Sequence, residues 1–134
     1  MDIVRATFFG ISTQDRPGEL ARFAARMAEC EINLAGIWAF GTGRGSAEII
    51  AIPRDPVAFR AASRDTGWSV REGPCFHLTG TDRAGALAET LDRIAQEGIN
   101  LHAVDAMGFV SQFSAYVWCD ERDVEKLRAV LKGW

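Results

Sequence analysis

The sequence has few cysteines and no surplus of basic residues, and each scarcity excludes a class of protein. Its 134 residues include 3 widely spaced cysteines, too few for a disulfide scaffold, which fits a reducing compartment. Lysine and arginine number 15 against 18 aspartates and glutamates, for a net charge of −3. No basic run is present to attract phosphates, so no nucleic-acid partner is expected.

Long apolar runs are also missing. No stretch approaches the roughly 20 apolar residues of a membrane-spanning helix. Met1–Arg5 lacks the basic start and apolar run of a signal peptide. Apolar residues nevertheless make up 48% of the chain, which is enough to bury a core. We therefore expect a soluble cytoplasmic protein with no membrane contact.

Residues that carry chemistry are sparse. Cys75 and His77 are two positions apart on one expected strand, so they share a face. His102 and Asp105 are three positions apart on a neighbouring element, which places them on opposite faces. No recognised metal-ligand spacing or nucleophile-elbow motif occurs. The glycines of 41–45 stand between two expected strands, as in a hairpin, whereas a phosphate-binding loop leads into a helix. We expect no metal, no cofactor and no catalytic activity.

What the chain does contain is an internal repeat. Residues 15–20 read Asp-Arg-Pro-Gly-Glu-Leu, and 67 positions later residues 82–87 read Asp-Arg-Ala-Gly-Ala-Leu. The same offset places Ile-Asn-Leu at 32–34 on Ile-Asn-Leu at 99–101. A six-residue run identical at four positions and an identical triplet, both at one offset of half the chain length, indicate a duplication.

Periodicity predicts similar elements in both halves. The first half should contain a strand at 3–12, a helix at 15–30, strands at 34–41 and 46–52, a helix at 53–67 and a strand at 68–71, closed by Gly73-Pro74. The second should contain a strand at 75–79, a helix capped by Asp82, strands at 101–109 and 113–119, and a last helix around 124–131. No fourth strand is evident in the second half.

This order predicts an α+β protein of two tandem ferredoxin-like βαββαβ units, residues 1–73 and 74–134. Each unit should have an antiparallel sheet with its helices on one face. The open edge of the second unit should be covered by the first half or by another subunit. We expect the halves to lie side by side in a sheet of about seven or eight strands, and the protein to form a homodimer.

Aromatic residues are numerous on the expected strands and beside them. They include Trp38, Trp68, Phe113, Tyr116 and Trp118. With helices on one face, some of these must lie on the other, either buried between units or subunits or exposed to stack nucleobases. The acidic balance disfavours base stacking.

The run Asp-Arg-Pro-Gly-x-Leu, followed after the helix by Ile-Asn-Leu, resembles the ACT domain family, once per half and over essentially the whole chain. Ala84 departs from the family pattern, where proline is usual. ACT domains are regulatory modules that commonly bind amino acids and control enzymes or transcription. The resemblance implies a ligand site at the loop before the first helix and at the start of the second strand. Carried over, the site residues are Thr13, Asp15, Arg16, Gly18, Asn33 and Leu34, and in the second half Gly80, Asp82, Gly85, Asn100 and Leu101.

These residue types suit an amino acid. A helix N-terminus attracts the carboxylate, Gly18 permits close approach, Asn33 both donates and accepts hydrogen bonds, and Asp15 could accept from the ammonium. Each also has a structural interpretation: Asp15 as a helix cap, Gly18 as a close-packing residue, Asn33 as a helix-ending turn and Arg16 as a solvated side chain.

We therefore expect a non-enzymatic regulatory protein that binds an amino acid and acts in trans on an enzyme or regulator. The alternative is an assembly module of the same fold without a ligand.

Overall fold

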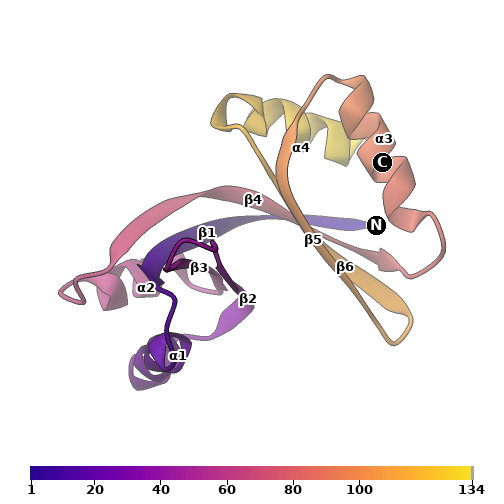
Figure 1. Cartoon of the computed structure of the whole chain (residues 1–134). Helices are drawn as coiled ribbons and strands as arrows, with labels where there is room; N and C mark the ends of the chain where they lie inside the picture. Colours follow the sequence, from indigo (N-terminus) through magenta and orange to yellow (C-terminus); the bar gives the residue numbers. More distant parts are fainter. Residues whose placement is uncertain (134) are drawn as a thin grey trace. The chain divides into compact units, whose positions relative to one another are not determined.

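The computed structural model describes residues 1–133, and within them the chain forms six strands and four α-helices (Figure 1). The strands are β1 (Asp2–Gln14), β2 (Leu34–Gly41), β3 (Ser46–Pro53), β4 (Ser69–Thr81), β5 (Leu101–Phe109) and β6 (Gln112–Cys119). The helices are α1 (Glu19–Glu29), α2 (Pro56–Ser63), α3 (Ala86–Gln96) and α4 (Val124–Lys132), the last preceded by a 3₁₀ turn, η1 (Glu121–Asp123). The α+β class is confirmed.

The chain divides into two compact units. The first unit is Thr7–Gly73, and the second is Met1–Ala6 together with the chain from Pro74 onward. The strand order is β2-β3-β1-β4 in the first unit and β1-β4-β6-β5 in the second. Because β1 and β4 each have 13 residues and contribute to both units, the described chain has one six-stranded sheet and not seven or eight strands.

The second unit obtains its fourth strand from the start of the chain. Residues 2–6 of β1 belong to the second unit, although the expected boundary after residue 73 would place them in the first unit. Ile3 packs against the second core, and Arg5 donates a 3.1 Å hydrogen bond from Nη1 to Oε1 of Glu125 on α4. The edge that the sequence left open is therefore covered from within the chain.

The first core lies between the two helices of its unit and one face of the sheet. Alternate residues of β1 and β3 point toward α1 and α2, because side chains alternate along a strand. The buried cluster comprises Phe9, Ile11, Phe23, Met27, Ile49, Ala51 and Phe59. Burying one such large side chain stabilises the fold by about 1.5–3 kcal/mol. On α1 only Phe23 and Met27 are buried, so the helix contacts the core along a narrow stripe.

The second core repeats this arrangement with α3 and α4. Phe76 and Leu78 on β4 and the odd-numbered residues of β6 face the two helices. The buried cluster comprises Phe76, Leu78, Ile94, Ile99, Phe113, Ala115, Val117, Val124, Leu127 and Leu131. Within each unit, the two helices therefore cover one face of that unit's strands, as predicted.

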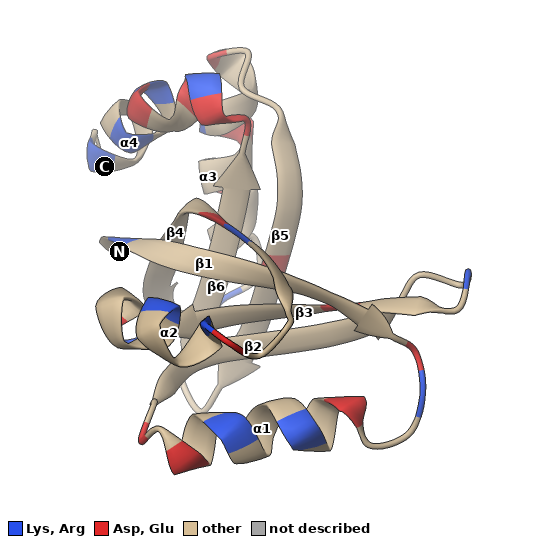
Figure 2. Cartoon of the chain, turned by 90° about the vertical axis from the view of Figure 1, so that its left-hand side faces the viewer, with Lys and Arg blue, Asp and Glu red and all other residues tan. Residues whose placement is uncertain are grey.

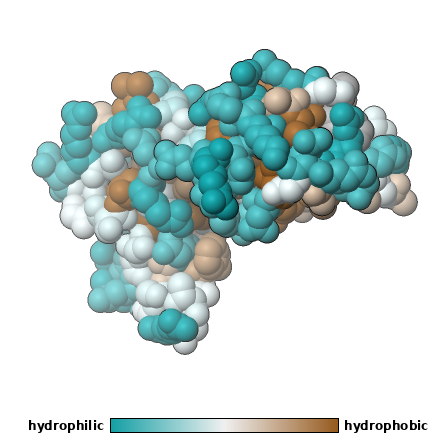
Figure 3. Space-filling model, turned by 90° about the horizontal axis from the view of Figure 1, so that it is seen from above, coloured by the Kyte–Doolittle hydropathy of each residue, from teal (hydrophilic) through white to brown (hydrophobic). Residues whose placement is uncertain are grey.

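Charge lies mainly outside these cores. Figure 2 shows most Lys, Arg, Asp and Glu on the helices and loops, whereas most of the strand ribbon is uncharged. On the face drawn in Figure 3 hydrophilic residues predominate, and hydrophobic residues form small separate patches. In residues 1–133 no helix is both long and apolar enough to cross a membrane.

The expected break at Gly73-Pro74 is wrong, because both residues lie inside the continuous strand β4. A Cβ on Gly73 would lie 3.0 Å from Cε1 of Phe8. Gly73 is thus explained by the close approach of an aromatic ring and not by a turn. The hairpin at 41–45 is confirmed: it joins β2 to β3, and the Thr42 amide donates to the Ser46 carbonyl at 2.9 Å.

Candidate functional site

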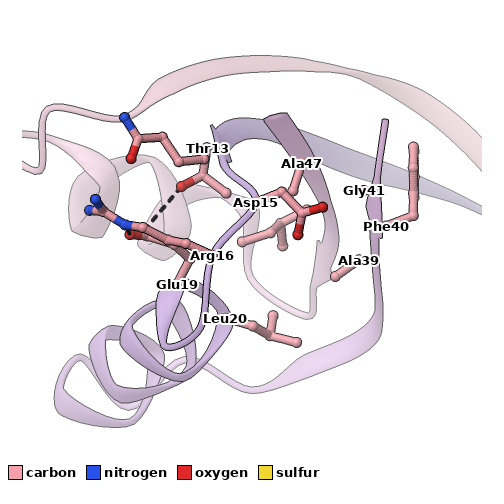
Figure 4. A pocket seen from close by; sticks show the side chains of 11 residues that line it. Thr13, Asp15, Arg16, Glu19, Leu20, Ala39, Phe40, Gly41 and Ala47 are labelled. Atoms are coloured by element: carbon pink, nitrogen blue, oxygen red, sulfur yellow. Dashed lines mark hydrogen bonds and ion pairs between the residues drawn. The ribbon is translucent and has the colours of Figure 1, made fainter. Parts of the chain in front are cut away.

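A cavity of about 180 Å³ opens in the first unit beside the loop between β1 and α1 (Figure 4). The loop and the first turn of α1 form one wall, and the ends of β2 and β3 form the other. Polar residues of the lining are Thr13, Gln14, Asp15, Arg16 and Glu19, and apolar ones include Leu20, Ala39, Phe40, Ala47 and Ile49. Three of the six residues implied for this half, Thr13, Asp15 and Arg16, are among them.

The loop is held at both of its ends by backbone hydrogen bonds. Where β1 ends, the Asp15 amide donates to the carbonyl of Gly45 in the β2–β3 hairpin at 3.1 Å. The chain then turns at Gly18, whose φ of 91° is the left-handed conformation that glycine adopts without strain. The first bond of α1 runs from the Arg22 amide to the Gly18 carbonyl at 2.9 Å. No side chain caps this helix.

The interpretation of Asp15 and Asp82 as helix caps is therefore wrong. The N-cap residues are Gly18 and Gly85, both left-handed, and neither helix has a side-chain cap. Asp15 instead turns its carboxylate toward β2, where Oδ2 lies against Gly41 so closely that a Cβ there would overlap it (Figure 4). The carboxylate is thus placed at the mouth of the cavity and not on the backbone of α1.

The second unit repeats this contact. A Cβ on Gly108 of β5 would lie 2.8 Å from Oδ2 of Asp82. Asp82 and Gly108 both stand 67 positions after Asp15 and Gly41, so the duplication preserves a tertiary contact as well as a motif.

Glu19 is a site residue that the sequence reasoning missed. Its side chain is only 12% exposed and accepts hydrogen bonds from Thr13 Oγ1 at 3.1 Å and from Arg16 Nε (Figure 4). Arg22 Nη1 lies 3.7 Å from its Oε2. The hydrogen bond from Arg16, followed by that from Thr13, lowers the pKa of Glu19. The repeat concealed this residue, because the matching position in the second half is Ala86.

A second cavity, of about 360 Å³, lies at the corresponding place in the second unit. Asp82, Arg83 and Gly85 stand at its loop side, and the rest of the lining is largely apolar: Ala86, Leu87, Ala88, Ala106, Met107 and Phe113. Gly80 lies under Phe113, since a Cβ there would come within 2.7 Å of the ring. The ring therefore packs over the backbone at the position that matches Thr13 of the first unit.

The remaining predicted residues do not line either cavity. Leu34 packs on the first core and Leu101 on the second. Asn33 and Asn100 are exposed. They do not end the helices in a left-handed turn either, because Glu31 (φ 55°) and Gly98 (φ 72°) hold that conformation. The Asn33 carbonyl accepts from the Arg54 amide at 3.0 Å.

The arginines at matching positions of α1 and α3 each contact the end of the second helix of their unit. Arg26 donates from Nε and Nη2 to the carbonyl of Ala62 near the end of α2, at 3.2 and 3.1 Å. Arg93 donates to the carbonyl of Gly133 after α4 at 3.5 Å. In each unit the first helix thus satisfies an end carbonyl of the second.

The aromatic residues are mostly withdrawn from solvent. Trp68 packs on Phe23 of the first core with ring centroids 5.4 Å apart, and Phe113 belongs to the second core. Tyr116 and Trp118 are buried, with Tyr116 stacked on His77 at 4.3 Å. Tyr116 and Trp118 therefore have no exposed face for stacking nucleobases, whereas Trp38 and Trp68 are only partly buried. Within the described 133 residues, no group of three or more His, Cys, Asp or Glu could hold a metal ion.

The topology defines the chain as a tandem ferredoxin-like α+β protein with one loop-side cavity per unit. No family model matches the chain, and no curated protein does. Solved structures do match over nearly its whole length. Protein BT0572 from Bacteroides thetaiotaomicron has a TM-score of 0.88 at 19% identity, over 98% of this chain and 89% of that one.

Two further matches come from aspartate kinases. The ligand-free regulatory subunit of aspartate kinase from Thermus thermophilus has a TM-score of 0.69 at 15% identity, over 99% of this chain and 97% of that one. Aspartokinase III of E. coli, in complex with lysine and aspartate, has a TM-score of 0.52 at 18% identity, over 93% of this chain and 30% of that one. The chain therefore shares its fold with the Thermus regulatory subunit and with the matched part of aspartokinase III, in agreement with the ACT resemblance of the repeated loop motif.

Proposed function

We propose that this protein is a regulatory module that binds an amino acid in the first-unit cavity and acts in trans on an enzyme or another regulator. The observation that carries the proposal is the grouping of Asp15, Arg16 and Glu19 around one small cavity. A free amino acid carries an ammonium and a carboxylate, so its binding site needs groups of both signs. Asp15 offers an acceptor for the ammonium, and the N-terminus of α1 and Arg16 favour the carboxylate.

Size and fold also support this ligand class. A cavity of about 180 Å³ lies below the usual 300–1,000 Å³ of pockets for drug-sized molecules, which favours a smaller ligand. The matched Thermus protein is a regulatory subunit, and the matched aspartokinase III binds lysine and aspartate. Ligand occupancy would be transmitted to a partner by favouring one state of the interface with that partner.

Thermal unfolding of the full chain with each of the twenty amino acids tests the proposal. A ligand at about 100 times its Kd stabilises the folded state by about 2.7 kcal/mol. Asp15→Asn should reduce that stabilisation, whereas Asp65→Asn, the same change at an exposed position outside the cavity, should not. Indifference of the wild-type chain to every amino acid would contradict the proposal.

A ligand-independent assembly module is the second candidate, and the edge strands favour it. β2 and β5 end the sheet order, and β5 with its hairpin exposes Met107 (65%), Phe109 (78%) and Val110 (87%). Exposed strand edges with apolar side chains favour pairing with another chain. Sedimentation velocity should then show a homodimer that Met107→Lys with Phe109→Lys dissociates. A tight dimer that no amino acid affects would favour this candidate.

A further inference from the structure

The second cavity keeps the geometry of the first but differs in its chemistry. Asp82, Leu87, Ala106 and Gly108 match first-unit residues of the same type at the offset of 67. The aspartate–glycine contact at the mouth is also kept. The loop-to-strand frame is therefore kept in both units, and the first difference lies on the wall that the loop and the first helical turn form.

That wall has lost its carboxylate. Glu19, which is nearly buried beside the first cavity, corresponds to Ala86 in the second. The loop arginine still has an acidic partner, since Arg83 Nη2 lies 3.2 Å from Glu89, but this glutamate is half exposed and is not part of the lining. The arginine's partner has thus moved one helical turn along α3, outside the cavity.

The polar groups above the wall have been replaced as well. Thr13, whose hydroxyl donates to Glu19, corresponds to Gly80. Ser46, whose hydroxyl lies 2.7 Å from that of Thr42, corresponds to Phe113, whose ring covers Gly80. Both changes remove a hydroxyl group. At the position of Ser46 the second unit has the aromatic ring of Phe113, which lines the second cavity. Leu87, Met107 and Phe113 line this more open cavity, whose volume is about 360 Å³ against about 180 Å³ for the first cavity.

We infer that the second cavity is a separate site for an amino acid with an apolar side chain, of a different class from the ligand of the first cavity. This inference rests on the proposed function. The Asp82 carboxylate at the mouth of the cavity accepts hydrogen bonds from the ligand's ammonium group, as Asp15 does in the first unit. The ligand's side chain lies against the apolar wall, where a polar group would lose its hydrogen bonds to water without replacement.

Isothermal titration of the full chain with L-leucine and L-asparagine tests the inference, because the two side chains have nearly the same shape and differ in polarity. Leucine should bind at least about tenfold more tightly than asparagine at this site. Ala86→Glu, which restores the first-unit residue, should weaken leucine binding by about tenfold or more. Ala95→Glu, an exposed position on the same helix, should leave leucine affinity unchanged.

Met107→Lys is a second cavity variant at a solvent-exposed edge position, and it carries the test if Ala86→Glu does not fold. Equal affinity for leucine and asparagine, or leucine binding that survives both cavity variants, would overturn the inference. A chain that binds a polar amino acid through Asp15 but binds neither leucine, methionine nor phenylalanine would refute this inference alone. A chain that binds no amino acid would refute the proposed function as well.

Discussion

The carboxylate of Asp15 occupies the space that a side chain on Gly41 would need, and Asp82 stands in the same relation to Gly108. Each contact joins the loop before a helix to the end of an edge strand. The glycine is therefore part of the site, because it allows the carboxylate to lie at the mouth of the cavity.

Gly41→Ala should displace the Asp15 carboxylate with little effect on stability. The added methyl group collides with the end of a flexible side chain, and alanine is less costly than glycine in a strand, so the free energy of unfolding should change by less than about 1 kcal/mol. Ligand affinity should fall about tenfold, because a charge-assisted hydrogen bond is lost. In an Asp15→Ala background the same substitution should not weaken binding further, and an undiminished effect there would refute the coupling.

Glu19→Gln should change how stability depends on pH. The pKa of Glu19 is lowered in the folded state, chiefly by Arg16, so ionisation stabilises the fold above the unfolded pKa of about 4.3. That contribution is lost as the pH falls through the lower folded pKa. The Tm difference between wild type and variant should be present at about pH 7 and shrink as the pH falls below the unfolded pKa. Glu97→Gln, at an exposed position, serves as the control. A Tm difference that does not depend on pH would contradict a stabilising role of the ionised Glu19 carboxylate.

Arg26→Ala should destabilise the first unit. The guanidinium donates two hydrogen bonds to the Ala62 carbonyl, but its side chain is 37% exposed, so we expect a loss of about 1 kcal/mol in urea denaturation. Arg44→Ala, in the exposed hairpin of the same unit, should change stability by less than about 0.5 kcal/mol. Equal effects of the two substitutions would show that the contact with α2 contributes nothing.

Ile3→Ala should destabilise the second unit although it lies at the start of the chain. Ile3 packs on the second core, and removing part of a half-buried side chain should cost about 1–2 kcal/mol. Val4 points to the other face of β1 and is 58% exposed, so Val4→Ala should change stability by less than about 0.5 kcal/mol. Chemical denaturation followed by far-UV circular dichroism gives the free energy of unfolding of both variants. A larger loss in Val4→Ala than in Ile3→Ala would contradict the assigned faces of β1.

Cys75 should resist alkylation until the protein unfolds. Burial raises the pKa of its thiol to about 12, so almost no reactive thiolate exists at about pH 8. Mass-spectrometric mapping after iodoacetamide treatment should show Cys75 reacting about a hundredfold or more slowly than half-buried Cys30. In denaturant the two rates should converge, and fast labelling of Cys75 in the folded chain would exclude its burial.

Much of the fold was predictable because local patterns decide it. The bounds of β2 and β5 agree with the sequence pattern, since a mainly apolar run between turn residues specifies a strand locally. The continuous strand at Gly73-Pro74 was not predictable from the sequence. Gly73 lies close to the ring of Phe8, which is 65 positions away in the sequence.

The candidate site was only partly predictable. The loop motif located Asp15 and Arg16, but repeat matching gave equal weight to Asn33 and Asn100, which the structure leaves exposed outside the cavities. Repeat matching also missed Glu19, because a comparison between the halves detects only identical residues and the matching position in the second half is Ala86. The role of Glu19 depends on how the halves differ.

The sequence by itself determined the duplication, the helices and strands, and the loop that carries each site, because these follow from residue patterns along one segment. Only the tertiary structure decided where the aspartates point and that residues 2–6 complete the second unit. It also decided that the two cavities present different walls to a ligand. Those features depend on side chains far apart in the chain, whose packing no local pattern specifies.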